Sequence, residues 1–446
     1  MLWYCTRLAI LGLWHSPKST FLAVVTVALG LSASMTTLTL LYVLSADPLP
    51  GISQNLYMAW VDTMPSNPSN RDDYALNGIA NSANNQEIKM SDARVLLAEH
   101  GALRQAAMAD MNVDVSAGSG ERKKKDQTIL AASSDFIPMF GVRILYGRGW
   151  SAAEEVARTP VVVIDSKLAQ QLFGTINAVD RNIRIGTKAF RVIGVSAPYE
   201  PQPHFYGLAS WAFSADSRES LYVPYTAALD ANISPVDTGR CDDTDVDKST
   251  TRVDLNHCTW LSYWVQLDTP AQVAGYRLYL ARYVEDQKIQ NRFTRPAKFQ
   301  LLGLSDWLTN QNVVPDNVRL NVWLAMSFLL LCMVNVAGLL AAKLFQRNSE
   351  IGIRRALGAS RNWIFIQHLV EASAVCALGG VLALPLTFLG LWILRQQDQR
   401  FTDLARLDPT MFGGLFLLAL VVGALVGLLP AWQASAVEPG LQVKNA

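Results

Sequence analysis

The chain has 446 residues and a formal net charge of +1, and only 17% of its residues are charged while 50% are hydrophobic. Soluble proteins contain roughly a quarter charged residues. The composition therefore excludes an ordinary soluble protein and indicates a protein of the membrane.

The first 18 residues combine aromatic with basic side chains: Trp3, Tyr4, Arg7, Trp14 and Lys18. This combination is typical of a helix that lies in the membrane–water interface. We predict an N-terminal interfacial elbow helix at residues 1–18, with a frayed terminus as the alternative.

Four long segments contain no charged residue: 19–46, 320–342, 372–394 and 409–437. Each is longer than the roughly 20 residues that a helix needs to cross the hydrocarbon core of a bilayer. We predict four transmembrane helices, at residues 19–46, 317–342, 372–394 and 411–433. The first segment is too long for the apolar core of a signal peptide, which has about 7–15 residues, so we expect it to be a retained span.

The loop between the second and third predicted spans, residues 343–371, contains five basic residues: Lys343, Arg347, Arg354, Arg355 and Arg361. Only Glu350 opposes them before Glu371. Because cytoplasmic loops carry an excess of Lys and Arg, we predict that this loop, the N-terminus and the tail 434–446 are cytoplasmic. The segments 47–316 and 395–410 then lie outside.

The long segment 47–316 shows the patterns of an α+β domain. Residues 91–101 carry a helix cap, a helical apolar period and a final glycine, which predicts a helix. VDVS around Val113 and TILAAS around Ile129 indicate two strands joined by a loop with the basic run 121–125. We expect this run to be a solvated tip, and binding of acidic head groups or substrates is the alternative.

Three further elements follow in the same segment. PVVVID at residues 160–165 is typical of a buried strand, and SKLAQQLFG at 166–174 of a capped helix. NIRIGTKAFRVIGV at 182–195 predicts a hairpin that turns at Gly186 and Thr187.

Cys241 and Cys258 are the only cysteines of the outside segment, so an oxidising compartment would favour a disulfide between them. We expect Cys5, Cys332 and Cys376 to be unpaired packing residues. The enclosed loop is acidic, and its carboxylates follow the spacing of a calcium loop: Asp243, Asp245, Asp247 and Asp254. Lys248 stands where such a loop needs glycine, so we favour an acidic surface loop, with a calcium site as the alternative.

The segment EIGIRRALGASR, residues 350–361, lies between two predicted spans and therefore at a membrane surface. Ile353, Ala356 and Leu357 have the i, i+3, i+4 spacing of one apolar helix face, and Gly358 follows where a helix commonly ends. A short amphipathic helix of this kind fits the groove of another protein. A basic stop-transfer loop is the alternative.

Motifs of catalysis are missing from the sequence. It contains no G-x-x-x-x-G-K-[ST], H-E-x-x-H, G-x-S-x-G or C-x-x-C motif, and its histidines lack metal-ligand spacing: His15, His100, His204, His257 and His368. We predict no catalytic, cofactor-binding or metal-binding residue in this chain. No charged residue lies in the interior of the four predicted spans, so we expect no coupling to an ion gradient.

Three blocks of the sequence resemble the permeases of MacB/FtsX-type ABC transporters. Residues 133–195 are similar to the MacB-like periplasmic core domain, residues 329–372 to the second span and coupling region, and residues 427–440 to the last span and its tail. MacB itself carries a fused ATPase domain that we do not find here. The region 228–258 looks like an insertion without a counterpart in that family.

The resemblance assigns roles to particular residues. The coupling helix that docks into an ATPase subunit would consist of Glu350, Ile351, Ile353, Arg354, Arg355, Ala356, Leu357 and Gly358. Pro430, Trp432, Ala434, Ser435 and Pro439 match the cytoplasmic end, for which a helix stop at Pro430 with an interfacial Trp432 is the alternative. Gly147, Arg148 and Gly149 match a turn of the periplasmic domain, where we expect a packing role.

The resemblance implies a bacterial inner-membrane permease with four transmembrane helices and a large α+β periplasmic domain inserted between the first two. It would work with a second permease copy and a cytoplasmic ABC ATPase dimer that binds ATP and Mg, together with a periplasmic adaptor and a TolC-like outer-membrane channel. We expect no nucleic-acid partner. The implied function is efflux of amphipathic antibiotics, peptides or toxins.

Three alternatives stay open at this point. A Lol-like permease would extract lipoproteins, and an FtsX-like regulator would pass conformational signals to periplasmic hydrolases or sensors without transport. An enzyme with a hydrolytic metal site at the acidic loop and His257 is the third.

Overall fold

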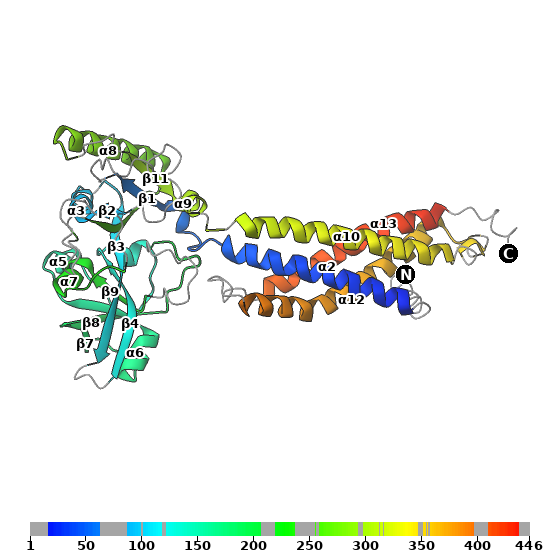
Figure 1. Ribbon diagram of the computed structural model, residues 1–446, viewed down its shortest axis with the longest axis horizontal. Helices are drawn as coiled ribbons and strands as arrows, with labels where there is room; N and C mark the ends of the chain where they lie inside the picture. The colour runs from blue at the N-terminus through cyan, green and yellow to red at the C-terminus, as the bar shows by residue number, and fades with distance from the viewer. Residues whose placement is uncertain are drawn as a thin grey trace, which may run out of the picture. The chain divides into compact units, whose positions relative to one another are not determined.

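The protein is described here by a computed structural model, shown in Figure 1. It describes residues 17–62, 87–99, 101–117, 122–206, 219–236, 255, 258–292, 298–311, 313–314, 316–346, 351–353, 355, 357–396 and 409–436. The chain divides into two compact units. We call Ala46–Val313 the sheet unit, and Met1–Ser45 with Val314–Ala446 the helical unit.

The sheet unit is built on one mixed sheet, which has 11 strands within the described residues. The strand order is β11-β1-β10-β3-β4-β9-β6-β8-β5, while β2 pairs with β10 and β7 pairs with β3 and β8. The pairs β4–β9 and β6–β8 are parallel. The strands are β1 Leu56–Val61, β2 Ile88–Lys89, β3 Arg104–Ala117, β4 Arg122–Ala132, β5 Ile144–Gly147, β6 Val161–Asp165, β7 Asn182–Ile185, β8 Lys188–Ser196, β9 Leu221–Pro224, β10 Thr259–Gln266 and β11 Phe299–Gly303.

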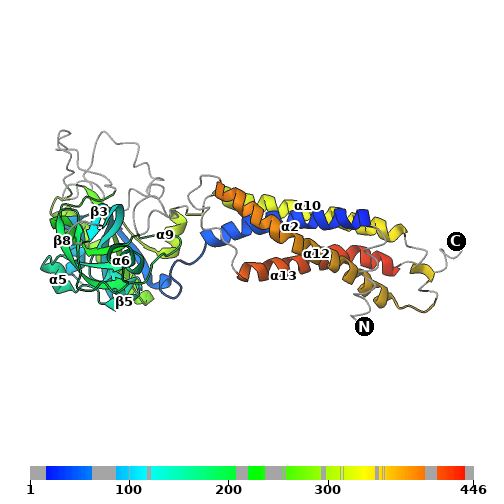
Figure 2. The ribbon, with the colours of Figure 1, turned by 90° about the horizontal axis from the view of Figure 1, so that it is seen from below.

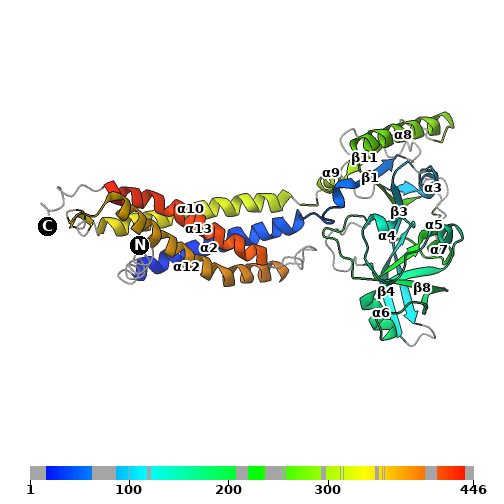
Figure 3. The ribbon, with the colours of Figure 1, turned by 180° about the vertical axis from the view of Figure 1, so that it is seen from behind.

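Helices flank the sheet. Helix α8 lies beside β11 (Figures 1 and 3), and α6 packs against β6. The helices of this unit are η1 Ser53–Asn55, α3 Met90–Ala98, α4 Phe136–Met139, α5 Ala152–Val156, α6 Ser166–Phe173, α7 Tyr225–Asp230, α8 Pro270–Ile289 and α9 Leu304–Asn310. Together with the sheet they form the α+β architecture that the sequence predicts.

Local sequence patterns placed several elements correctly. Helix α6 begins after Asp165, whose carboxylate accepts a hydrogen bond from the Leu168 backbone N–H, and ends at Gly174 with φ +72°. These are the N-cap and C-cap that the pattern indicates. The predicted hairpin at 182–195 is β7 and β8, with Gly186 in the turn at φ +56°.

The basic run at residues 121–125 is partly different from the prediction. Arg122 to Lys125 belong to β4, because β3 continues to Ala117 and keeps the antiparallel ladder going, with Ala117 opposite Arg122. Lys123, Lys124 and Lys125 are exposed. These three lysines are therefore solvated, as expected, but they lie on a strand rather than in a loop.

Aromatic side chains fill the core of the sheet unit. Phe136 and Phe140 stack with a centroid distance of 4.8 Å, and Trp264 contacts Phe140 and Phe205 edge-on. All four are at most 1% exposed. Such pairs add about 0.5–1.5 kcal/mol each beyond the burial of their area, so they hold the short α4 against β10.

Within the described residues, the helical unit has four long helices, which are shown in Figure 2. They are α2 Pro17–Leu44, α10 Asp316–Gln346, α12 Arg361–Gln396 and α13 Pro409–Ala436. Helices α2 and α13 each pack along both α10 and α12. Small residues bring the helices close: a Cβ on Gly379 of α12 would lie 2.6 Å from a methyl group of Val27 on α2. Close packing at small residues is how helices associate in a bilayer, where lipid removes the usual hydrophobic drive.

Three of these helices are long and apolar enough to cross a membrane, over Pro17–Leu44, Asn317–Gln346 and Arg361–Leu394. In the described part of α13 the apolar stretch is shorter, Phe416–Leu428. Pro430 does not end α13, which continues to Ala436. The predicted elbow helix at residues 1–18 lies almost wholly outside the described residues.

Two of the helices extend beyond the predicted spans. Helix α10 continues past Lys343, and α12 begins ten residues before Glu371, so both charged residues lie inside candidate spans. They stay buried there because they pair with each other.

Candidate functional site

The hairpin between α10 and α12 contains the predicted coupling residues. Residues 351–353 and Arg355 are helical, and the backbone N–H of Leu357 donates to the Ile353 carbonyl oxygen at 3.0 Å. The helical turn ends at Gly358, where φ is +99°, a conformation that favours glycine. Glu350, Arg354 and Ala356 lie outside the described residues.

The hairpin has an inner and an outer side. Ile351 is 5% exposed and packs with Leu344 of α10 and Ile364 of α12, so it belongs to the inner side. Ile353 and Leu357, four residues apart on one helical face, are 54% and 83% exposed. In the described residues, the hairpin thus presents two exposed apolar side chains on its outer side, while its inner side packs against α10 and α12.

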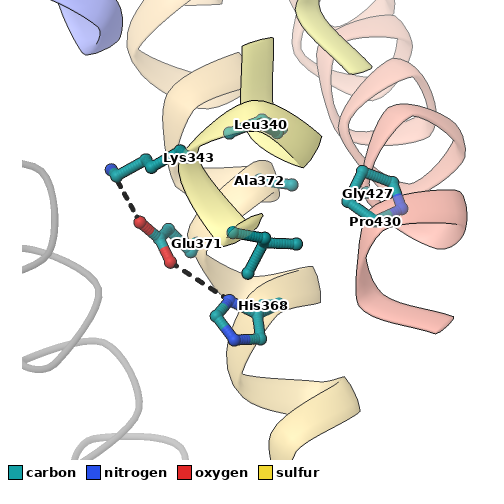
Figure 4. Close-up of a pocket in the computed structure, with 8 residues that line it drawn as sticks. Leu340, Lys343, His368, Glu371, Ala372, Gly427 and Pro430 are labelled. Carbon is teal, nitrogen blue, oxygen red and sulfur yellow. Dashed lines mark hydrogen bonds and ion pairs between the residues drawn. The ribbon is translucent and has the colours of Figure 1, made fainter. Parts of the chain in front are cut away.

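A buried ion pair lies at the base of the hairpin (Figure 4). Lys343 Nζ on α10 lies 2.8 Å from Glu371 Oε1 on α12, and His368 Nδ1 lies 3.4 Å from the other carboxylate oxygen. The three side chains are only 9–10% exposed. They line a pocket together with apolar residues of three helices: Leu340, Leu344, Ala372, Gly427 and Pro430.

Sequence reasoning missed this cluster. Lys343 and Glu371 mark the ends of uncharged segments, and Lys343 also counts among the basic loop residues, but neither observation relates the two to each other. The available signal was that Glu371 and His368 lie three residues apart, and so share a helix face once the segment is known to be helical.

The sheet unit contains a second group of buried titratable side chains. His204 Nε2 lies 2.5 Å from Glu219 Oε1, and the Tyr206 hydroxyl donates to Glu219 Oε2 at 3.0 Å. Burial lowers the pKa of His204, but the charge and hydrogen bond of Glu219 outweigh this and raise it to about 9. Burial, and then the charge of Glu219, raise the pKa of Asp110 to about 7. No group of three such side chains in the described residues has the geometry of a metal site.

The turn at Gly147 packs as the resemblance implies. A Cβ on Gly147, whose φ is +73°, would lie 2.1 Å from the Ile193 carbonyl oxygen. The Arg148 guanidinium donates to both carboxylate oxygens of Glu154, at 2.7 and 2.8 Å. The turn therefore fixes β5 against β8 and α5.

The disulfide and calcium predictions concern a loop that lies mostly outside the described residues. Cys258 is disulfide-bonded, and its predicted partner Cys241 lies outside that part of the chain, so the pairing stays a prediction. Cys332 and Cys376 are free and buried, as expected. The carboxylates of the calcium alternative, and His257, also lie outside the described residues.

Comparisons with known proteins place these features in a family. The family described as MacB-like periplasmic core domain matches residues 20–277, more than half of the chain. The chain belongs to the MacB-like family. The FtsX-like permease C-terminal family matches residues 323–439, which include the hairpin and the Lys343–Glu371 pair. This MacB-like protein therefore combines a MacB-like periplasmic core domain with an FtsX-like permease domain and several apolar helices.

Two relatives show how far the likeness extends. The macrolide export ATP-binding/permease protein MacB of Psychrobacter cryohalolentis is 26% identical over 318 residues, covering 70% of this chain and 42% of that protein. The pyoverdine export ATP-binding/permease protein PvdT of Pseudomonas aeruginosa is 26% identical over 310 residues, covering 69% and 40%. The MacB-like chain thus spans about two fifths of the length of the curated relatives it matches.

Solved structures that are similar include the periplasmic region of MacB from Actinobacillus actinomycetemcomitans. It is 16% identical, and the match covers 57% of this chain and 92% of that one with a TM-score of 0.34.

Proposed function

We propose that this chain is the permease subunit of an ABC transporter of the inner membrane, and that its hairpin docks into an ATP-hydrolysing subunit in the cytoplasm. The observation that carries this proposal is the outward pair Ile353 and Leu357, 54% and 83% exposed on a hairpin within the FtsX-like match. A small apolar helix face suits a groove on a partner protein.

The topology that goes with this proposal has four spans, with both termini and the hairpin in the cytoplasm and the sheet unit in the periplasm. The excess of basic residues in the 343–371 loop supports this orientation. A second permease copy, a periplasmic adaptor and a TolC-like channel complete the proposed machine. The ATPase subunit would hold ATP and Mg, and the hairpin would carry its movement to the spans.

The proposed cargo is an amphipathic antibiotic, peptide or toxin that is expelled from the periplasm. The names of two similar proteins, which specify macrolide export and pyoverdine export, support this class of cargo. Protection of cells against a drug panel tests the efflux function. If cells without this chain lose cell-wall hydrolysis but keep their protection against drugs, the FtsX-like regulator is favoured. Lipidated protein trapped in the purified complex would favour the Lol-like extractor.

Docking of the hairpin is tested with Ile353→Asp combined with Leu357→Asp. Two apolar side chains buried in a groove contribute about 3 kcal/mol together, so we expect an affinity loss of about 100-fold for the ATPase subunit. Val156→Asp is the matched control, because Val156 is 82% exposed, about as much as Leu357, but lies in the sheet unit.

The measurement is the amount of ABC-type ATPase that purifies with the chain, with the vanadate-sensitive ATP hydrolysis of the complex. Unchanged values in the double variant would refute the docking face.

A further inference from the structure

The Lys343–Glu371 pair joins the two arms of the hairpin at its base. Lys343 lies in the last turn of α10, and Glu371 lies in the third turn of α12, with the hairpin residues between them in sequence. Their side chains meet at 2.8 Å (Figure 4). The ends of the two helices are thereby linked at a level between the hairpin and the rest of the bundle.

Burial makes this link stiff. Lys343 is 9% exposed and Glu371 10%, so separating them would leave two charges that water does not solvate. Removing one partner of such a pair is strongly destabilising, because the remaining charge is buried without compensation. His368 Nδ1, 3.4 Å from Glu371 Oε2, holds the second carboxylate oxygen and so fixes the orientation of the carboxylate.

An apolar layer lies beside the pair toward the hairpin tip. Leu344, Ile351 and Ile364 form it, with Trp363 packed against it. Apolar contacts are non-directional, whereas the ion pair joins two particular side chains and so holds one register. The combination makes the hairpin a continuation of both helices rather than a separate loop.

We propose that the Lys343–Glu371 pair is a positioning element that makes the hairpin, the end of α10 and the start of α12 move as one body. A displacement of the outward face at Ile353 and Leu357 then reaches both spans at once. The inference rests on the proposed docking of the hairpin, and it adds the residues that carry the movement onward.

The experiment uses the permease–ATPase complex in lipid nanodiscs and three readouts: bound ATPase, ATP hydrolysis, and hydrogen exchange of residues 46–313 with and without ATP plus vanadate. The variants are Glu371→Gln and Lys343→Met, the conservative Lys343→Arg, and the exchange Lys343→Glu with Glu371→Lys. Arg361→Gln is the matched control, because it removes one exposed charge from the same hairpin.

We expect Glu371→Gln and Lys343→Met to keep the bound ATPase and its hydrolysis, but to reduce the nucleotide-dependent change in exchange of residues 46–313 about tenfold or more. Lys343→Arg and the exchanged pair should restore that change, and Arg361→Gln should leave it intact. A purely structural role would instead lower bound ATPase, hydrolysis and exchange response together, which would overturn the proposal.

An unaltered exchange response in Glu371→Gln would also overturn it. If Glu371→Gln fails to fold, Lys343→Met with Glu371→Leu replaces it, because an apolar pair of similar volume usually preserves folding. A wild-type chain without a bound ATPase would refute the docking proposal itself, so the two failures are distinguishable.

Discussion

Replacing Glu155 by glutamine tests how burial controls the pH dependence of the sheet unit. Glu155 lies in α5, is 9% exposed, and its Oε2 accepts a hydrogen bond from the Ser134 backbone N–H. Burial raises the pKa of this carboxyl from 4.5 to about 7, against the lowering effect of that hydrogen bond. The native state therefore binds more protons than the unfolded chain between these two pH values.

The extra protons bound by the native state decide the direction in which stability changes with pH. Stability contributed by Glu155 is fully present below pH 4.5, and is lost as the pH rises through about 7. A shift of this size corresponds to about 3 kcal/mol at one unit per 1.36 kcal/mol, and about 2–3 kcal/mol of it falls between pH 5 and pH 8. Glu155→Gln removes this part of the pH dependence, while the side-chain amide oxygen of the variant can still accept the hydrogen bond from the Ser134 N–H.

The assay is urea unfolding of the full chain in nanodiscs at pH 5 and pH 8, followed by tryptophan fluorescence. The quantity compared is the loss in free energy of unfolding between the two pH values, which should be about 2–3 kcal/mol smaller in Glu155→Gln than in wild type. Glu154→Gln is the matched control. The hydrogen bonds of Arg148 lower the pKa of Glu154 to about 2, so its titration lies below this window.

Equal pH losses in wild type and Glu155→Gln would refute the reasoning. Other groups that titrate in the window, such as His204, contribute equally to both proteins and cancel in the comparison.

Two further predictions concern the sheet unit. His204→Gln should flatten the decline of stability between pH 6.5 and about 9, because the raised pKa of His204 gives stability that is present below pH 6.5 and is lost as the pH rises. The free energy of unfolding at pH 6 and pH 9 measures this decline. An unchanged decline in the variant would contradict the prediction. Gly147→Ala should destabilise the chain by about 2 kcal/mol or more, since the new Cβ would lie 2.1 Å from the Ile193 carbonyl oxygen at a positive φ. Gly275→Ala, in open space on α8, should instead stabilise by about 0.5–1 kcal/mol, and equal melting temperatures for both alanine variants would count against the argument.

Short-range patterns in the sequence were sufficient for the local elements. Asp165 and Gly174 mark the ends of α6 within nine residues of each other, so each is readable without knowledge of the fold. The extent of β4 was not readable in this way. Whether residues 122–125 join the sheet depends on the partner strand β3, which continues to Ala117.

The same distinction holds for the candidate site, where one part follows from local sequence and the other from helix packing. The outward face of the hairpin follows from helical spacing, and Gly358 ends the turn where expected. The Lys343–Glu371 pair depends on the packing of two helices, and rules based on charge-free lengths treat both residues as boundaries. The helices extend beyond the uncharged segments, and there the two opposite charges pair with each other.

The chemistry at the hairpin base also determines which helices move together. Helix α13 reaches this level through Gly427, whose added Cβ would lie 2.7 Å from the Ala372 Cβ, and through the ring of Pro430. These contacts are apolar and close, so α13 packs tightly against α12. Helix α10 is held to α12 by a buried ion pair that cannot be stretched without exposing an unpaired charge. A push on the hairpin should therefore displace α10 and α12 together.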